Sequence, residues 1–194
     1  MKLGVLDVQG DVTEHVRSLE AAVGSLGLDA DVVAVRTPGS IGSLSALVIP
    51  GGESTTVGKL MREYRLDRAV LEVAESIPIF GTCAGMVLLS REGDNLKEGQ
   101  SLLGLMDALV LRNAYGRQRE SFEAELDIPV LGGGVFPGVF IRAPAFERVW
   151  GGCECLCEHG GKVVLARQGD ILASAFHPEL TCDTRLHEYF LEMI

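Results

Sequence analysis

Short apolar runs alternate with amphipathic stretches through the first half of the chain. After the first run, Val12, Val16, Leu19, Val23 and Leu26 recur every three or four positions. This period predicts a helix that ends at Gly27, and a capping box is expected from the spacing of Asp11 and Glu14. Strands are expected at residues 3–8, 31–35, 46–49 and 78–80, and further helices at 56–65 and 67–75. Such alternation is typical of an α/β fold with helices on both faces of a parallel sheet.

Beyond Gly99 the pattern changes to β-like segments with little helix between them. These segments span residues 122–128, 139–142, 162–167 and 171–176. Residues 183–194 then place Leu186, Tyr189, Phe190 and Met193 on one helical stripe. We therefore expect an antiparallel or mixed extension of the sheet, followed by a docked helix. The sequence contains no repeat or linker, so residues 1–194 are expected to form one domain.

Composition narrows the class of protein. The 194 residues are 47% hydrophobic and 23% charged, a balance typical of folded domains. With 17 Lys and Arg against 27 Asp and Glu, the formal net charge is −10. This argues against a nucleic-acid partner, because phosphate binding relies on clustered cations. The first residues do not form a signal-peptide pattern, and no stretch reaches the roughly 18–20 apolar residues that a membrane-spanning helix needs.

The five cysteines indicate a reducing environment. Their number is odd, and Cys153, Cys155 and Cys157 alternate too closely to bridge one another. Reduced thiols in a cytoplasm are the simplest interpretation. Alternate positions would put these three cysteines on one face of a strand. Because they lack a C-x2-C pair and one strand does not readily give tetrahedral geometry, packing in the core is favoured over a metal site.

The first candidate for chemistry is Gly81-Thr82-Cys83-Ala84-Gly85. It follows an apolar strand and precedes an apolar helical run, which is the context of a nucleophile elbow. A helix that begins beyond Cys83 would favour its thiolate. The alternative is a buried cysteine that packs as a small hydrophobe. The strand–turn–helix context favours the nucleophile.

A cysteine nucleophile needs a base, and His177 is the best placed of the four histidines. It follows the apolar segment 171–176 and precedes Pro178, and Glu179 is two residues further on. The carboxylate could hold one ring nitrogen while the other faces Cys83. By itself the tripeptide His-Pro-Glu is more often a turn that ends a strand; together with the cysteine elbow it favours a triad.

The third candidate is the loop Pro50-Gly51-Gly52-Glu53-Ser54. Its glycines leave backbone N–H groups free to approach a substrate oxygen, and with the N–H of Ala84 they would form an oxyanion hole. The alternative is a plain turn before a helix capped by Ser54 or Thr55, and for the glycines alone that alternative is favoured. A helix cap is compatible with either interpretation.

Together, these motifs resemble the triad (class I) glutamine amidotransferases, which use Cys, His and Glu. Within them the chain resembles the glutaminase subunits of pyridoxal 5′-phosphate synthase over essentially its whole length. The resemblance rests on residues 6–10, 14–15, 50–56, 112–113, 116–118, 121–124, 138–144 and 176–181. It implies an α/β, three-layer, flavodoxin-like fold with a mostly parallel central sheet and an antiparallel or mixed extension. Asp7 and Asp11 are more acidic than is usual in that family, and Asp11 is interpreted as the helix cap.

The resemblance also implies roles for individual residues. Cys83 would attack the side-chain amide of glutamine, His177 would transfer protons, and Glu179 would orient His177. The N–H groups of Gly52 and Ala84 would hold the oxyanion. Glutamine recognition would involve Gly52, Glu53, Ser54, Arg112, Ile141 and Arg142. An arginine fork suits a carboxylate such as that of an amino acid; the alternative for Arg112 and Arg142 is an ordinary ion pair.

A partner follows from the resemblance as well. Free ammonia is largely protonated near neutral pH, so it needs a shielded path to its acceptor. The implied partner is a (β/α)8-barrel synthase subunit in a large hetero-oligomer, and no metal or organic cofactor is implied for the glutaminase itself. A related cysteine-elbow hydrolase that acts on another γ-glutamyl or peptide amide is the second candidate, and a binding module with a relic elbow is disfavoured because all three triad residues are present.

Overall fold

Five parallel strands form the part of the sheet that carries the candidate site. The computed structural model describes residues 1–116 and 121–194, so Arg117 and Gln118 of the motif at 116–118 lie outside the described residues. The strand order is β2-β1-β3-β4-β12, with every neighbouring pair parallel. These strands are β1 (Lys2–Leu6), β2 (Asp31–Val35), β3 (Ala46–Ile49), β4 (Ile79–Thr82) and β12 (Ile171–Ser174). With β12 as fifth strand, this is the 2-1-3-4-5 order of flavodoxin-like folds.

Beyond β12 the sheet continues through antiparallel pairs. β12 pairs with β11, β11 with β9 and β9 with β6, while β5 lies parallel to β6 at the edge and β10 pairs with β11. β7 and β8 form a separate antiparallel sheet. These strands are β5 (Ser90–Asp94), β6 (Met106–Leu111), β7 (Ser121–Leu126), β8 (Phe136–Ile141), β9 (Ala145–Val149), β10 (Glu154–His159) and β11 (Lys162–Gln168). The expected mixed extension is confirmed.

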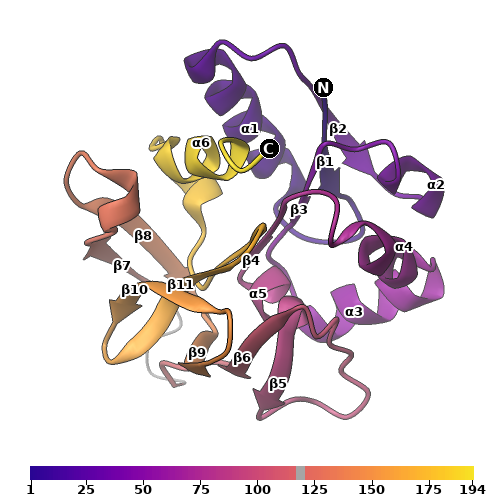
Figure 1. Ribbon diagram of the computed structural model, residues 1–194. Helices are drawn as coiled ribbons and strands as arrows, with labels where there is room; N and C mark the ends of the chain where they lie inside the picture. The colour runs from indigo at the N-terminus through magenta and orange to yellow at the C-terminus, as the bar shows by residue number, and fades with distance from the viewer. Residues whose placement is uncertain (117–120) are drawn as a thin grey trace.

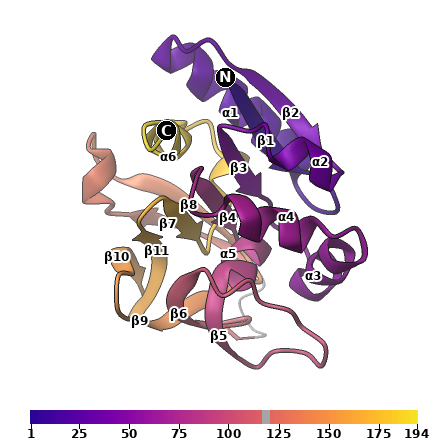
Figure 2. The same ribbon diagram turned by 45° about the vertical axis from the view of Figure 1, so that its right-hand side comes forward.

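Helices cover both faces of the parallel strands, which gives three layers (Figure 1). α1 and α6 pack against each other on one face, and α2 to α5 lie on the other, as the turned view in Figure 2 also shows. The helices are α1 (Val12–Leu26), α2 (Pro38–Ile41), α3 (Ser54–Glu63), α4 (Leu66–Val73), α5 (Ala84–Leu89) and α6 (Arg185–Leu191), with 3-10 turns η1 (Pro129–Leu131) and η2 (Pro178–Leu180). Among the described residues, no helix is long and apolar enough to cross a bilayer.

The central strands are buried from end to end. All residues of β3, β4 and β12 are buried, because helices on both faces leave no solvent side. Phe80 lies in register with Val48 on β3 and with Leu172 on β12. This alignment brings the carboxyl ends of the three strands to one edge, where ligand sites of open α/β sheets lie.

Several elements match their sequence patterns closely. β2 and β3 have the predicted bounds, and α1 ends at Gly27 in the left-handed conformation with φ 63°. On α6, Leu186 and Phe190 are buried while Tyr189 and Met193 are partly buried against the core. The expected helical stripe therefore docks on the sheet.

The expectation for the three closely spaced cysteines is wrong for Cys155. Cys153 and Cys157 are buried, but Cys155 is exposed. The pairing of β10 with β11 shifts register between Cys155 and Cys157, and such an irregularity changes which side chains face the core. Burial raises the pKa of Cys153 and of Cys157 to about 11, so both stay protonated near neutral pH. The three thiols therefore do not share the single face on which a metal site was considered.

Candidate active site

Cys83 lies in the tight turn between β4 and α5. Its φ of 46° and ψ of −97° are unusual for a residue with a side chain, and such strain is typical of functional sites. Close packing excludes side chains at the flanking glycines: a Cβ on Gly85 would lie 2.2 Å from the carbonyl oxygen of Ile49, and one on Gly81 would lie 2.7 Å from the backbone of Gly85. The Cys83 N–H donates to the carbonyl of Ser174 at 2.8 Å. The expected strand, turn and helix are formed.

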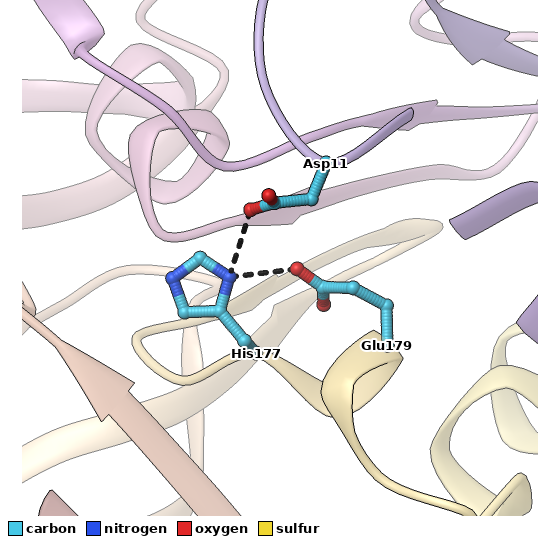
Figure 3. Close-up of side chains that lie close together, drawn as sticks. All are labelled: Asp11, His177 and Glu179. Atoms are coloured by element: carbon cyan, nitrogen blue, oxygen red, sulfur yellow. Dashed lines mark hydrogen bonds and ion pairs between the residues drawn. The ribbon is translucent and has the colours of Figure 1, made fainter. Parts of the chain in front are cut away.

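His177 follows β12 and lies beside Cys83 at the same edge of the sheet. Its Nδ1 is 2.7 Å from Oε1 of Glu179, the first residues of η2 having turned the carboxylate back towards the ring (Figure 3). The N–H of His177 donates to the carbonyl of Val139 at 2.8 Å, which anchors the residue to β8. Both side chains of the pair are buried. The structure thus brings Cys83, His177 and Glu179 together as predicted.

Asp11 is a second carboxylate at the same ring nitrogen. Its Oδ2 lies 3.4 Å from Nδ1 of His177 (Figure 3). Asp11 occupies the N-cap position of α1 but makes no side-chain capping hydrogen bond, so the predicted capping box with Glu14 is wrong. The side chain turns to the imidazole because that contact is charge-assisted once His177 is protonated. Asp11, His177 and Glu179 also lie close enough to hold a metal ion, but the contacts of both carboxylates with Nδ1 of His177 account for their proximity.

These contacts favour a protonated imidazole. Burial opposes the charge on His177, yet hydrogen bonds with Asp11, Cys83 and Glu179 outweigh it and raise the pKa of His177 to about 12. Burial also raises the pKa of Glu179, while the hydrogen bond to His177 acts against that rise. An imidazolium beside a thiol side chain is the form that donates a proton to a departing group.

A pocket of about 430 Å³ opens in front of Cys83 and His177, within the size range of small-ligand sites. Glu179 is not part of its lining and lies behind the imidazole. The pocket is lined by every residue that the resemblance assigned to glutamine recognition or to the oxyanion hole: Gly52, Glu53, Ser54, Ala84, Arg112, Ile141 and Arg142.

Glu53 organises one wall of this pocket. Its carboxylate accepts hydrogen bonds from the N–H and the hydroxyl of Thr56, both at 2.9 Å, and forms ion pairs with Arg112 at 2.9 Å and Lys97 at 3.2 Å. Although burial acts in the opposite direction, the hydrogen bonds from Thr56 and Lys97 lower the pKa of Glu53 to about 2. Glu53 is therefore the N-cap of α3, and the expected cap by Ser54 or Thr55 is wrong.

The hydroxyls of Ser54 and Thr55 are engaged elsewhere. Both point to Oε1 of Gln100, at 3.3 Å and 2.9 Å. They hold the loop at the start of α3 against the segment that follows β5. Ser54 is buried and still lines the pocket.

Gln9 is a pocket residue that the sequence patterns did not single out. Its side-chain oxygen accepts a hydrogen bond from the N–H of Glu53 at 3.0 Å. At Gly52, φ is 136°, and a Cβ there would lie 2.7 Å from the same Gln9 oxygen. Gln9 and Gly52 together determine the path of the loop. Ala84, as the first residue of α5, has an N–H without a partner inside the helix.

The far wall also has strained backbone. Asn113 and Arg142 line the pocket with φ of 50° and 43°, a region that residues with side chains rarely occupy. Arg142 is exposed, and within the described residues no carboxylate forms an ion pair with it. Arg112, in contrast, is paired with Glu53, which is the ordinary ion pair considered as its alternative.

Residues 5–194 match the SNO glutamine amidotransferase family. The chain belongs to this family. It is 55% identical to a protein of Pelotomaculum thermopropionicum named pyridoxal 5′-phosphate synthase subunit PdxT, over 99% of this chain and 94% of that protein. A protein of the same name from Moorella thermoacetica is 52% identical, with both chains covered in full. A solved structure described as a glutamine amidotransferase superposes with a TM-score of 0.86 at 50% identity, covering 98% of this chain and 97% of that one.

In this SNO glutamine amidotransferase, three further buried side chains lie behind Glu179. His15, Thr82 and His187 are each 0% exposed. The sequence patterns placed His15 and His187 on helices, and the family resemblance included residues 14–15, but neither assigned these histidines a role. A histidine at a position of α1 that faces the sheet was the available signal, but periodicity cannot say which distant group such a side chain meets.

Proposed function

We propose that the protein is the glutaminase subunit of pyridoxal 5′-phosphate synthase and that it hydrolyses L-glutamine to L-glutamate and ammonia within one domain of residues 1–194. The observation that carries this proposal is the pairing of Cys83 and His177 in one pocket, with Glu179 at 2.7 Å from the far ring nitrogen. Nucleophile, proton carrier and orienting acid are the parts that acyl transfer from an amide requires. Family membership supports glutamine as the amide.

The reaction proceeds in two steps. The Cys83 thiolate attacks the side-chain amide carbon of glutamine, and His177 donates its proton to the nitrogen as the C–N bond breaks, which releases ammonia and leaves a γ-glutamyl thioester. Neutral His177 then takes a proton from water as its oxygen attacks the thioester carbon, and the C–S bond breaks. Glutamate departs, and thiolate and imidazolium are restored. Glu179 stabilises the imidazolium that is present before the first step and again after the second.

The pocket walls divide the work of binding glutamine. The N–H groups of Gly52 and Ala84 hold the developing oxyanion. Arg142 is the cation available for the α-carboxylate of the substrate, because Arg112 is already paired with Glu53. Glu53 and Ser54 shape the near wall, and Ile141 covers the aliphatic part of the substrate.

Ammonia passes to a synthase subunit. We propose a (β/α)8-barrel partner in a large hetero-oligomer, since the names of the relatives describe them as subunits of a synthase. Five free cysteines suit the cytoplasm, where thiols stay reduced. Neither a metal ion nor an organic cofactor takes part in the proposed steps.

The test is glutamate release, measured with and without the synthase subunit of the same organism. Release by the complex and its loss in Cys83→Ala would support the proposal; release at the unsubstituted rate in Cys83→Ala would overturn it. A set of other γ-glutamyl compounds and peptide amides tests the second candidate, a related cysteine-elbow hydrolase. Faster turnover of one of these than of glutamine would assign the protein to that class.

A further inference from the structure

A row of buried polar groups continues the triad away from the pocket. Oε2 of Glu179 lies 3.3 Å from Nε2 of His15 on α1. The same nitrogen is 2.9 Å from the hydroxyl of Thr82 at the end of β4. Nδ1 of His15 lies 3.3 Å from Nε2 of His187 on α6. Three elements that are distant in sequence thus meet behind Glu179, the buried carboxylate that contacts His177.

The surroundings of this row are apolar. Phe80 packs edge-on against both His15 and His187, and Phe190 packs against Phe80. Polar groups buried in such surroundings are costly unless they are hydrogen-bonded. The positions of their protons are therefore strongly constrained.

Glu179 determines the tautomer of His15. Its Oε2 is buried and makes no well-aligned hydrogen bond within the described residues, and the nitrogen that faces it is Nε2 of His15, at 3.3 Å. If Nε2 of His15 carries the proton, this N–H edge faces both Oε2 and the Thr82 oxygen. If Nε2 is bare, its lone pair faces a carboxylate oxygen, which is repulsive and leaves that oxygen without a donor.

His187 leads to the same assignment from the other end. Its Nδ1 is buried and makes no hydrogen bond in the described part of the chain. With His15 protonated at Nε2, His187 donates from its own Nε2 to Nδ1 of His15, so its unpartnered Nδ1 is only a lone pair. The opposite arrangement would leave a buried N–H without an acceptor, and orphaned N–H groups are rarer than orphaned acceptors.

Both histidines are neutral. Burial, with adverse interactions from His187 and His177, lowers the pKa of His15 well below its usual value, and burial alone lowers the pKa of His187 to about 4. A neutral imidazole has one donor and one acceptor nitrogen. The tautomer argument therefore applies to both rings.

We propose that His15 is a positioning residue of the glutaminase site, whose Nε2–H edge holds Oε2 of Glu179, and that His187 stabilises this tautomer of His15 by donating to its Nδ1. The donors then run in one direction, from His187 to His15 and on to the Thr82 oxygen and the adjacent Oε2 of Glu179, whose other oxygen accepts from His177. This arrangement rests on the proposed function only in so far as His177 serves glutamine hydrolysis; the geometry itself does not depend on the substrate.

The first experiment uses the unsubstituted protein. Nitrogen-15 chemical shifts of the histidine rings distinguish a protonated from a bare ring nitrogen, near neutral pH and without any change of sequence. We expect the Nε2–H tautomer for both His15 and His187. The Nδ1–H tautomer at His15 would overturn the proposal.

The second experiment compares His15→Gln with His15→Leu. A glutamine amide can place an N–H near the position of Nε2, whereas leucine fills similar volume without a donor. With the synthase present, we expect His15→Leu to lower kcat on the order of tenfold with little change in KM, and His15→Gln to recover most of the loss. Equal kcat in the two variants would overturn the proposal.

A third measurement does not need glutamine. The rate at which iodoacetamide alkylates Cys83 is followed against pH, because it reports the thiolate beside His177. We expect His15→Leu to shift this profile, while Phe190→Leu, a control change in the same core, leaves it in place. An unshifted profile in His15→Leu would contradict the proposal. Failure of the unsubstituted complex to release glutamate would instead refute the proposed function.

Discussion

Two carboxylates reach the same ring nitrogen of His177 from regions of opposite character. The side chain of Glu179 is 0% exposed and makes a 2.7 Å contact, whereas that of Asp11 is 39% exposed at 3.4 Å. Charge interactions strengthen where water is excluded and weaken where solvent screens them. Burial, rather than the number of nearby charges, therefore decides which acid orients the imidazole.

The regions behind these two acids differ in the same way. Behind Glu179 lie neutral histidines and phenylalanines, and α1, β4 and α6 hold them in a close-packed core. Around Asp11 lie a glycine loop and the charged wall formed by Glu53, Lys97 and Arg112. The buried side is suited to hold one geometry, and the open side to admit and bind a substrate.

The largest expected effect comes from Glu179→Gln. The amide can donate to Nδ1 of His177 and so stabilise the wrong tautomer. The neutral ring then carries its proton on the nitrogen that faces Cys83, and this nitrogen has no lone pair with which to take a proton. We expect kcat for glutamate release by the complex to fall by about 10³ to 10⁴-fold, as when the acid of a triad becomes an amide. A fall no larger than that of Asp11→Asn would show that burial does not decide which acid orients His177.

The next effect is on stability against pH. His187 has a pKa of about 4 in the folded protein and about 6.5 when unfolded, so its contribution is present above pH ~6.5 and lost as the pH falls towards 4. Between about pH 7 and 5, this residue should lower the free energy of unfolding by about 2 kcal/mol. Urea unfolding at both values measures it. Identical pH slopes in the unsubstituted protein and His187→Gln would refute the assignment.

A smaller effect is expected from Asp11→Asn. It removes a partly exposed charge that helps to raise the pKa of His177, so the alkaline limb of the kcat/KM profile should move to lower pH. We expect the maximal rate to fall by less than about tenfold, because exposed ion pairs contribute roughly 1 kcal/mol or less. The pH profile of glutamate release by the complex measures both. A loss as large as that of Glu179→Gln would show that the two carboxylates act as equals.

The smallest effect is a difference in response to salt. Screening shortens the range of surface charges from about 10 Å at 0.1 M to about 3 Å at 1 M. The rate ratio between the unsubstituted protein and Asp11→Asn should therefore approach one in high salt, while the ratio for Glu179→Gln should not change. Parallel salt dependence of both ratios would place the two acids in the same environment.

Much of the fold follows from local patterns. The three- and four-residue period of α1 and the short apolar runs of β2 and β3 agree with the structure almost residue by residue. The pattern failed where a side chain had two possible partners. Asp11 had the spacing of a cap, but it faces His177 instead, and Glu53 caps α3 in place of Ser54.

The elbow follows from the local sequence, since Gly81 and Gly85 flank Cys83 at the positions where only glycine fits. The local sequence also placed Glu179 two residues beyond His177, close enough to meet the ring. The tertiary structure alone decided which groups stand behind Glu179: His15 and His187 are 172 residues apart along the chain and meet only because α1 and α6 pack on the same face of the sheet. Contacts within a few residues are dictated by backbone geometry, whereas contacts across the fold depend on how whole elements pack.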